Sequence, residues 1–163
     1  MKIVHALALA GLLGAGIAAP ASAEVIRHTT PGSTFPILRA SETTAGTTTV
    51  YLSGMVPKVK DESAPEGSVA RFGDTETQTV SVFETIAATL ADLGLTMGDV
   101  FKMQVFLTGP DGGPMDFDGF MKGYTQFFGT EAQPNLVSRS VMQAAGLVNP
   151  GWLVEIEVTA ARP

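Results

Sequence analysis

The chain has 163 residues, a formal net charge of −6, no cysteine and two histidines. Its acidic balance, without any cluster of Lys or Arg, argues against a nucleic-acid partner, because phosphate backbones are bound by basic surfaces. Zinc-type metal sites draw mainly on Cys and His, so the composition also argues against a metal site. The one histidine after residue 23, His28, is expected to be a solvated side chain.

Residues 1–23 have the order of a secretory signal peptide. Lys2 precedes an uncharged apolar stretch over residues 6–19, and Ala21-Ser22-Ala23 follows. A basic end, a short apolar stretch and an A-x-A site are typical of a cleavable signal. A transmembrane anchor is the alternative, but the stretch is shorter than the ~20 residues that span a bilayer. We therefore expect a periplasmic or secreted protein, not held by a membrane after cleavage, with one domain over residues 24–163.

Three elements are predicted in the first part of this domain. Residues 47–57 are rich in β-branched side chains and end at a proline, which predicts a strand. Residues 75–93 place apolar side chains at helical spacing and stop before a glycine, which predicts a helix. Residues 100–107 predict a second strand, with Val100, Lys102 and Gln104 expected on one face.

A stripe of large apolar side chains predicts a second helix over residues 116–128. Its members fall three or four residues apart: Phe117, Phe120, Met121, Tyr124, Phe127 and Phe128. We interpret the stripe as core. A base-stacking surface is the alternative, but such platforms are usually paired with positive charge that this region lacks.

Residues 137–144 and 153–161 predict two more strands, separated by a turn. In the last strand Val154, Ile156 and Val158 alternate with Glu155 and Glu157, so the two carboxylates are expected on one face. The order strand, helix, strand, helix, strand, strand predicts an α+β domain in which two helices pack on one face of a mixed sheet.

Arg139 is the candidate binding residue, because its planar guanidinium fork matches a carboxylate. Glu155 is expected on a neighbouring strand, within reach of whatever Arg139 holds. The open alternative is an ordinary cross-strand ion pair between these two side chains.

Several segments together resemble the RidA (YjgF-like) family of imine deaminases. The C-terminal segments are SRSVM at residues 138–142, AGL at 145–147 and VEIE at 154–157. Further back, SGMVP at residues 53–57 and the aromatic helix are similar to the family's first strand end and second helix. The resemblance implies a chorismate-mutase-like fold and a homotrimer with ligand clefts between subunits. It also implies cofactor-independent hydrolysis of 2-imino or 2-enamino acids, small substrates that bear a carboxylate, to 2-oxo acids and ammonia.

The resemblance also implies roles for single residues. Arg139 matches the arginine that holds the substrate carboxylate, Glu155 the glutamate that orients the attacking water, and Ser53 a serine lining the cleft. Four further positions depart from the family pattern: Met121 replaces an asparagine, Val141 a cysteine, Met55 a glutamine, and Phe35 a tyrosine.

Each of these departures removes polarity from the expected cleft. A cleft with apolar walls favours a bulkier hydrophobic imine, or else a module that binds carboxylates without catalysis; the sequence leaves both open. Ribonuclease activity, which is also ascribed to this family, is disfavoured by the acidic composition and the scarcity of histidine.

Overall fold

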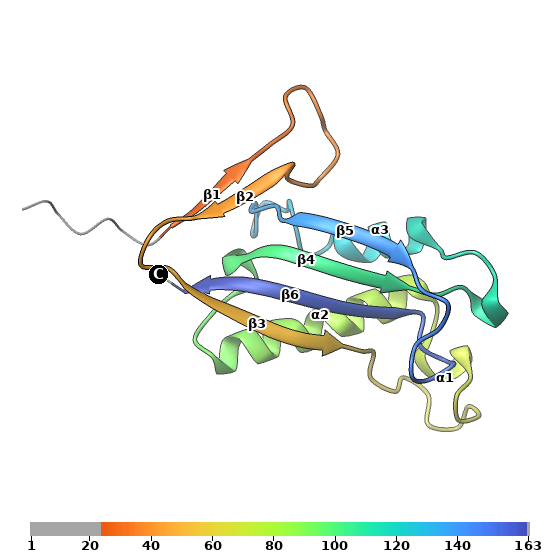
Figure 1. Ribbon diagram of the computed structural model, residues 1–163. Coiled ribbons are helices and arrows are strands. Elements are labelled where there is room, and N and C mark those ends of the chain that lie inside the picture. The colour runs from red at the N-terminus through yellow and green to blue at the C-terminus, as the bar shows by residue number, and fades with distance from the viewer. Residues whose placement is uncertain (1–23, 163) are drawn as a thin grey trace, which may run out of the picture.

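The computed structural model describes residues 24–162, so the predicted signal peptide lies outside the described residues. At its centre is a four-stranded sheet with the order β3-β6-β4-β5 (Figure 1). Its strands are β3 (Thr48–Met55), β4 (Val100–Leu107), β5 (Ser138–Gln143) and β6 (Val154–Arg162). β6 runs antiparallel to both β3 and β4, whereas β4 and β5 are parallel, so the sheet is mixed as predicted.

Two helices, α2 (Thr75–Asp92) and α3 (Phe117–Tyr124), lie on one face of this sheet (Figure 1). The short segments α1 (Val69–Phe72), η1 (Met97–Asp99) and η2 (Pro110–Gly112) form connections between the larger elements. No helix covers the opposite face of the sheet within the described residues. The predicted α+β architecture, with two helices on one side of a mixed sheet, is confirmed.

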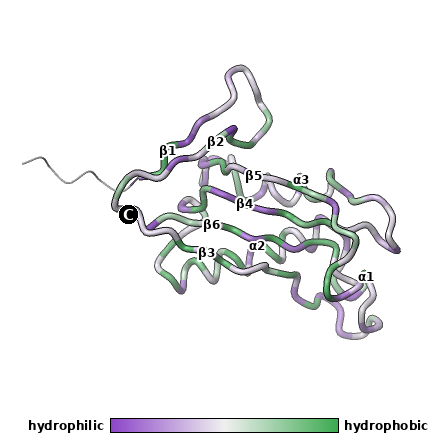
Figure 2. The backbone as a smooth tube through the Cα atoms, viewed as in Figure 1, coloured by the Kyte–Doolittle hydropathy of each residue, from purple (hydrophilic) through white to green (hydrophobic). Residues whose placement is uncertain are grey.

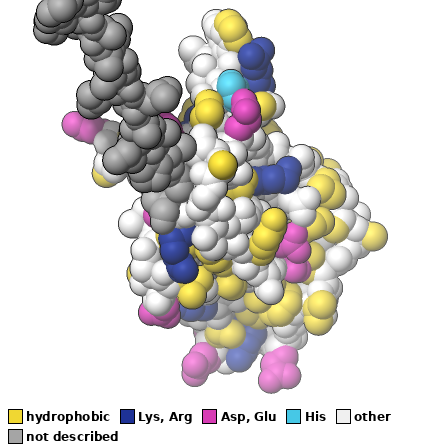
Figure 3. Space-filling view, turned by 60° about the vertical axis from the view of Figure 1, so that its left-hand side comes forward, with side chains coloured by type: hydrophobic (Ala, Val, Ile, Leu, Met, Phe, Trp, Pro, Cys, Tyr) yellow, Lys and Arg dark blue, Asp and Glu magenta, His cyan; other side chains and the backbone are white. Residues whose placement is uncertain are grey.

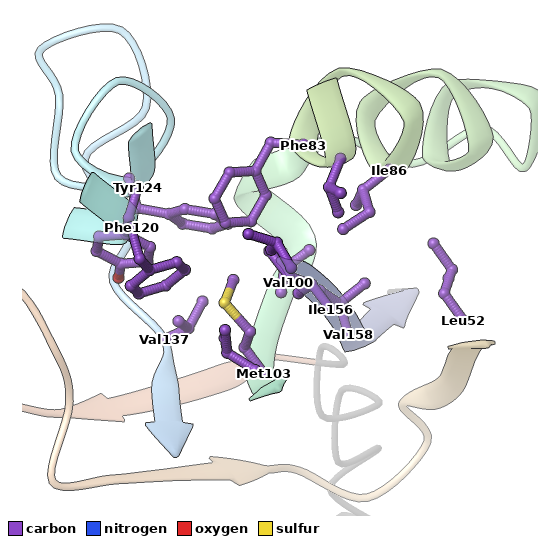
Figure 4. Close-up of a cluster of buried hydrophobic side chains, with 14 of the residues drawn as sticks. Leu52, Phe83, Ile86, Val100, Met103, Phe120, Tyr124, Val137, Ile156 and Val158 are labelled. Atoms are coloured by element: carbon purple, nitrogen blue, oxygen red, sulfur yellow. The ribbon is translucent and has the colours of Figure 1, made fainter. Parts of the chain in front are cut away.

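The core lies between the helices and the sheet. Phe83 and Ile86 of α2 point toward Ile156 of β6, and Phe120 and Tyr124 enter from α3 (Figure 4). All five side chains are fully buried. Burying side chains of this size contributes roughly 1.5–3 kcal/mol each, so this layer dominates the stability of the fold. The interpretation of the aromatic stripe as core is therefore confirmed.

The strands alternate between buried and exposed side chains, which Figure 2 shows as changes of hydropathy along β4 and β6. In β6 the valines and Ile156 are buried and the two glutamates are half-buried, as predicted. In β4 a register shift between Val100 and Lys102 turns Val100 into the core. The predicted grouping of Val100 with Lys102 and Gln104 is therefore wrong, because a bulge changes the parity of the alternation.

The second predicted helix is shorter than expected, since α3 ends at Tyr124. Beyond it, the Gln126 amide donates to the Gly123 carbonyl and the Phe127 amide to the Tyr124 carbonyl, at 3.2 and 3.0 Å. These bonds span three residues rather than four and tighten the chain into turns. The aromatic side chains of residues 127–128 keep their contact with the core although the helix has ended.

An N-terminal hairpin of β1 (Val25–His28) and β2 (Ala40–Thr43) was not predicted from the sequence. Each strand has only four residues, and β2 is mostly polar, so neither shows a clear alternation. Arg27 attaches the hairpin to the body by donating to the Val100 and Leu136 carbonyls at 3.0 and 2.6 Å. His28 is not simply solvated, because its Nε2 lies 2.5 Å from Glu42 Oε1.

Candidate functional site

Arg139 is the second residue of β5, the edge strand of the main sheet. It is aligned with Met103 of β4, whose side chain is fully buried beneath the helices. Aligned residues of parallel strands project from the same face, so Arg139 points toward α3 rather than toward solvent. A cation is thus placed at the margin of an apolar layer.

The guanidinium of Arg139 lies in an aromatic cage formed by Phe35, Phe120 and Tyr124. Its central carbon is 4.2 Å from the ring centroid of Tyr124, 5.0 Å from that of Phe120 and 5.8 Å from that of Phe35. Contacts of this kind contribute roughly 0.5–2 kcal/mol each, more as water is removed. The rings hold the cation in place without using its N–H groups as hydrogen-bond donors.

The hydrogen-bonding groups of Arg139 are incompletely satisfied. Nη2 donates to the Met121 sulfur at 3.3 Å, and a thioether is a weak acceptor. Nη1 is buried and has no hydrogen-bond partner, and no carboxylate of the described residues pairs with this guanidinium. An unpaired buried cation costs several kcal/mol, so an anion that reached Nη1 would be bound strongly.

Burial lowers the pKa of Arg139 from its ordinary value because desolvation disfavours the charged form, and Tyr124 partly offsets this effect. An arginine remains protonated at neutral pH despite such a shift. Burial also raises the pKa of Tyr124 to about 12, with the Arg139 charge acting in the opposite direction. The site therefore combines a cation with a neutral phenol at physiological pH.

The segment before β2 forms the outer wall of the cage. The Tyr124 hydroxyl donates to the Pro36 carbonyl at 2.9 Å, and the Leu38 amide donates to the Val137 carbonyl at 3.0 Å. These two bonds fix the segment that presents Phe35, whose ring remains 45% exposed. Phe35 is therefore the cage residue that an incoming ligand can contact most freely.

Met121 and Val141, two other predicted cleft residues, belong to the same region. Met121 contacts the guanidinium directly, as described above. Val141 follows Arg139 by two residues in β5, so its side chain lies on the same face of the sheet. Both pack against the core cluster and are only partly buried. The structure thus brings Arg139 together with Phe35, Met121 and Val141.

Glu155 and Ser53 lie on the other face of the sheet. Glu155 alternates with the fully buried Val154 and Ile156, so its side chain points away from the helices. Its carboxylate lies directly against Gly54 of β3, where a side chain on residue 54 would overlap it. Ser53 is exposed on the same strand, at the bulge between Leu52 and Met55.

Within one chain, therefore, Arg139 and Glu155 do not meet. The expectation that Glu155 is on a strand neighbouring that of Arg139 is wrong, because β4 lies between β5 and β6 in the sheet. The ion-pair alternative fails for the same reason. The sequence predicted the four strands but not their lateral order, which depends on how the helical crossovers pack.

The face that bears Glu155 is hollowed. A depression of about 600 Å³ lies over β3, β6 and β4, with Tyr51, Ser53, Gln104 and Glu157 among its lining residues. The Gln104 amide donates to the Glu157 carboxylate at 2.8 Å across this surface. Lys and Arg side chains are scattered singly over the part of the molecule seen in Figure 3, without a basic stripe.

Phe120 and Tyr124 were predicted as core and not as site residues, although they form two walls of the cage. A signal was present in the sequence: Arg139 stands between Val137 and Val141 at strand spacing, so it had to share the face on which they are buried.

Within residues 24–162, no three His, Asp or Glu side chains gather closely enough to hold a metal ion. None of the helices described here has the length and apolar character required to cross a membrane.

A sequence model of the family described as endoribonuclease L-PSP matches residues 35–162. Among solved structures, TdcF of E. coli with bound serine is 30% identical, with a TM-score of 0.56, over 74% of this chain and 84% of that one. An uncharacterised protein of Pseudomonas aeruginosa is 27% identical, with a TM-score of 0.54, over 86% of this chain and 100% of that one. The fold is also shared with YyfB of Yersinia pestis, described as a protein of unknown function of the conserved Rid family, at 21% identity and a TM-score of 0.64, over 86% of this chain and 98% of that one.

Proposed function

Since the chain belongs to the endoribonuclease L-PSP family, the YjgF/RidA family, we propose that it hydrolyses 2-imino or 2-enamino acids to 2-oxo acids and ammonia. The observation that supports this proposal is the buried, caged guanidinium of Arg139 with an unpartnered Nη1. Binding of serine, an amino acid with a carboxylate, to the related TdcF is consistent with a carboxylate clamp at this position. The compartment in which the reaction occurs is proposed to be periplasmic or extracellular, on the basis of residues 1–23.

In this proposal Arg139 binds the substrate carboxylate and thereby fixes the imine carbon. The incoming anion replaces the weak thioether acceptor at Nη2 and satisfies Nη1. Charge-assisted bonds of this kind are about twice as strong as neutral ones, and a bidentate pair also fixes orientation. Holding substrate and water in a reactive arrangement can remove several kcal/mol of the barrier.

The chemical step consumes one water. The water oxygen attacks C2 of the imino acid while Glu155 accepts a proton from it, and the electron pair of the C=N bond moves to nitrogen, which takes up a proton. In the resulting carbinolamine the hydroxyl proton is transferred to the amino nitrogen, the C–N bond breaks, and ammonia leaves as the oxygen electron pair forms the C=O bond of the 2-oxo acid. No oxidant, reductant or cofactor is required by this balance. A positioned general base contributes typically 10²- to 10⁴-fold to such a step.

Because Arg139 and Glu155 occupy opposite faces of one sheet, a shared cleft requires two copies of the chain. We propose a homotrimer in which the hollowed face of one subunit, with its Glu155, covers the β5 edge of the next. The helix-free face, with Tyr51 78% exposed, offers the surface for such packing. In this arrangement each subunit supplies the arginine to one cleft and the glutamate to another.

Turnover of imines generated in place tests the proposed reaction. An amino-acid oxidase with catalase supplies the imine, and semicarbazide traps whatever remains, so the protein should lower adduct formation. Arg139→Ala should reduce kcat/KM roughly 10- to 100-fold, because hydrogen bonds to a charged group are lost. The exposed Arg39→Ala is the matched control and should leave the rate unchanged. Equal rates for wild type and Arg139→Ala would exclude the proposal.

The alternative is a module that binds carboxylates without catalysis. Its motive is the loss of polar side chains at Phe35, Met121 and Val141. Calorimetry with 2-oxo acids separates the two functions, since binding abolished by Arg139→Ala without any imine turnover would establish the alternative. Cleavage of RNA has less support, because His28 of the described residues is engaged by Glu42 on the hairpin.

A further inference from the structure

The guanidinium of Arg139 is suited to the carboxylate of the substrate, whereas the apolar side chains around it are suited to the substrate's own side chain. From their placement we infer that the cleft selects imino acids with an uncharged, apolar side chain, and that Met121 is the residue that sets this preference. This inference rests on the proposed function for the reaction. The inferred selectivity applies to binding as well as to turnover, so it can be tested by binding alone.

Met121 is placed to contact both the clamp and the substituent of a bound acid. Its sulfur is 3.3 Å from Arg139 Nη2, and its side chain is only partly buried. Because a thioether is a weak acceptor, it yields to a carboxylate without competing for it. Methionine also adapts its shape to an irregular apolar partner, which suits it to line a substrate pocket.

Two further apolar side chains lie on the same side of the sheet. The exposed ring of Phe35 stands 5.8 Å from the guanidinium carbon, and Val141 follows Arg139 on the same face of β5. A carboxylate that replaces the Met121 sulfur at Nη2 therefore brings the neighbouring substituent of the acid close to Met121, on the side of the sheet that also bears Phe35 and Val141. Transfer of an aliphatic substituent from water to these walls is favourable.

Two polar side chains on this side of the sheet, those of Tyr124 and Gln143, are already engaged by the protein. The Tyr124 hydroxyl donates to the Pro36 carbonyl at 2.9 Å. The Gln143 amide donates to the Gly113 carbonyl at 2.9 Å and accepts from the Met115 amide at 3.2 Å. A polar substituent that lies against Met121, Phe35 and Val141 would lose its bonds to water without gaining new ones from this wall of the cleft, which opposes its binding.

Leucine and asparagine provide the decisive pair of imines, because their side chains have nearly the same shape and differ in polarity. Wild type should hydrolyse the leucine-derived imine with a kcat/KM that is on the order of tenfold or more higher than for the asparagine-derived imine. Met121→Asn should lower this ratio by on the order of tenfold, whereas Met121→Leu, the matched control, should keep it. Equal rates for the two imines in wild type, or an unchanged ratio in Met121→Asn, would overturn the inference.

Calorimetry with the two corresponding 2-oxo acids keeps the inference testable if no imine is hydrolysed. Tighter binding of 4-methyl-2-oxopentanoate than of 2-oxosuccinamate, lost in Met121→Asn and kept in Met121→Leu, would support apolar selectivity while the proposed reaction fails. Equal binding of both acids by wild type would overturn the selectivity, even where imine turnover is present.

Discussion

The position of the Glu155 carboxylate depends on the absence of a side chain at Gly54. The glutamate lies flat against the backbone of β3 at this point, and a methyl group on residue 54 would overlap its carboxylate. The backbone angles of Gly54 are not in the left-handed region, so alanine is conformationally acceptable there. Gly54 is therefore a positioning residue for the proposed base, and the effect of changing it is steric.

Gly54→Ala should lower kcat by on the order of tenfold or more and leave KM nearly unchanged, because the carboxylate is displaced while the Arg139 clamp is untouched. Steady-state kinetics with imines generated in place provide the measurement. Gly146→Ala is the matched control, since a side chain there meets open space. A fall in thermal stability as the sole consequence of Gly54→Ala would assign Gly54 a structural role.

The sequence analysis expected Arg139, Phe35, Met121 and Val141 near one another, and the structure places them on one side of the sheet. Glu155 and Ser53, which were expected in the same cleft, lie on the opposite face. The caging of the guanidinium by Tyr124 was not predicted, because spacing along a helix shows which side chains share a face but not which strand they contact. That information depends on the docking of α3.

Among the elements, α2 begins with a defined cap. Asp74 accepts a hydrogen bond from the Thr77 amide at 2.9 Å, and this bond lowers the pKa of Asp74 below its ordinary value of 3.8. A capping carboxylate also interacts favourably with the helix dipole. The cap fixes the first turn of the longest helix, which carries Phe83 and Ile86 into the core.

Asp74→Ala should lower the free energy of unfolding by about 1 kcal/mol at neutral pH. The pKa of this group is depressed in the folded state, so its contribution is present above pH 3.8 and is lost as the pH falls through the lower folded value. Urea unfolding of wild type and variant across acid pH measures the difference. A gap that persists at the lowest pH would contradict the capping role, and Asp92→Ala at the other end of α2 is a control.

The elements themselves were predicted better than their arrangement. The strands near residues 100 and 154 and the helix that begins at residue 75 agree closely with the structure, because their patterns are long and regular. The hairpin at residues 25–43 was missed, since its short strands depend on tertiary bonds such as those of Arg27. A bulge in β4 changes which of its side chains face the core, and the hydrophobic pattern of the sequence does not indicate this bulge.

For the molecule as a whole, the order of strands in the sheet determines where Arg139 and Glu155 lie. With β4 between β5 and β6, the clamp and the proposed base point in opposite directions. In the proposed mechanism a single subunit therefore carries two incomplete halves of the cleft, and a neighbouring copy completes each of them. The resemblance implied clefts between subunits, but the spacing argument expected Glu155 on a strand next to that of Arg139, because spacing along the chain does not give the lateral order of strands.

Complementation between two inactive variants tests whether the cleft is shared between subunits. Arg139→Met and Glu155→Gln, each nearly inactive alone, are co-expressed with different tags and mixed trimers are purified. If each cleft joins Arg139 of one subunit to Glu155 of the next, every mixed trimer has one intact cleft among its three, and activity should recover to about a third of the wild-type value. Activity of the mixed trimers no higher than that of the two variants alone would contradict a cleft shared between subunits.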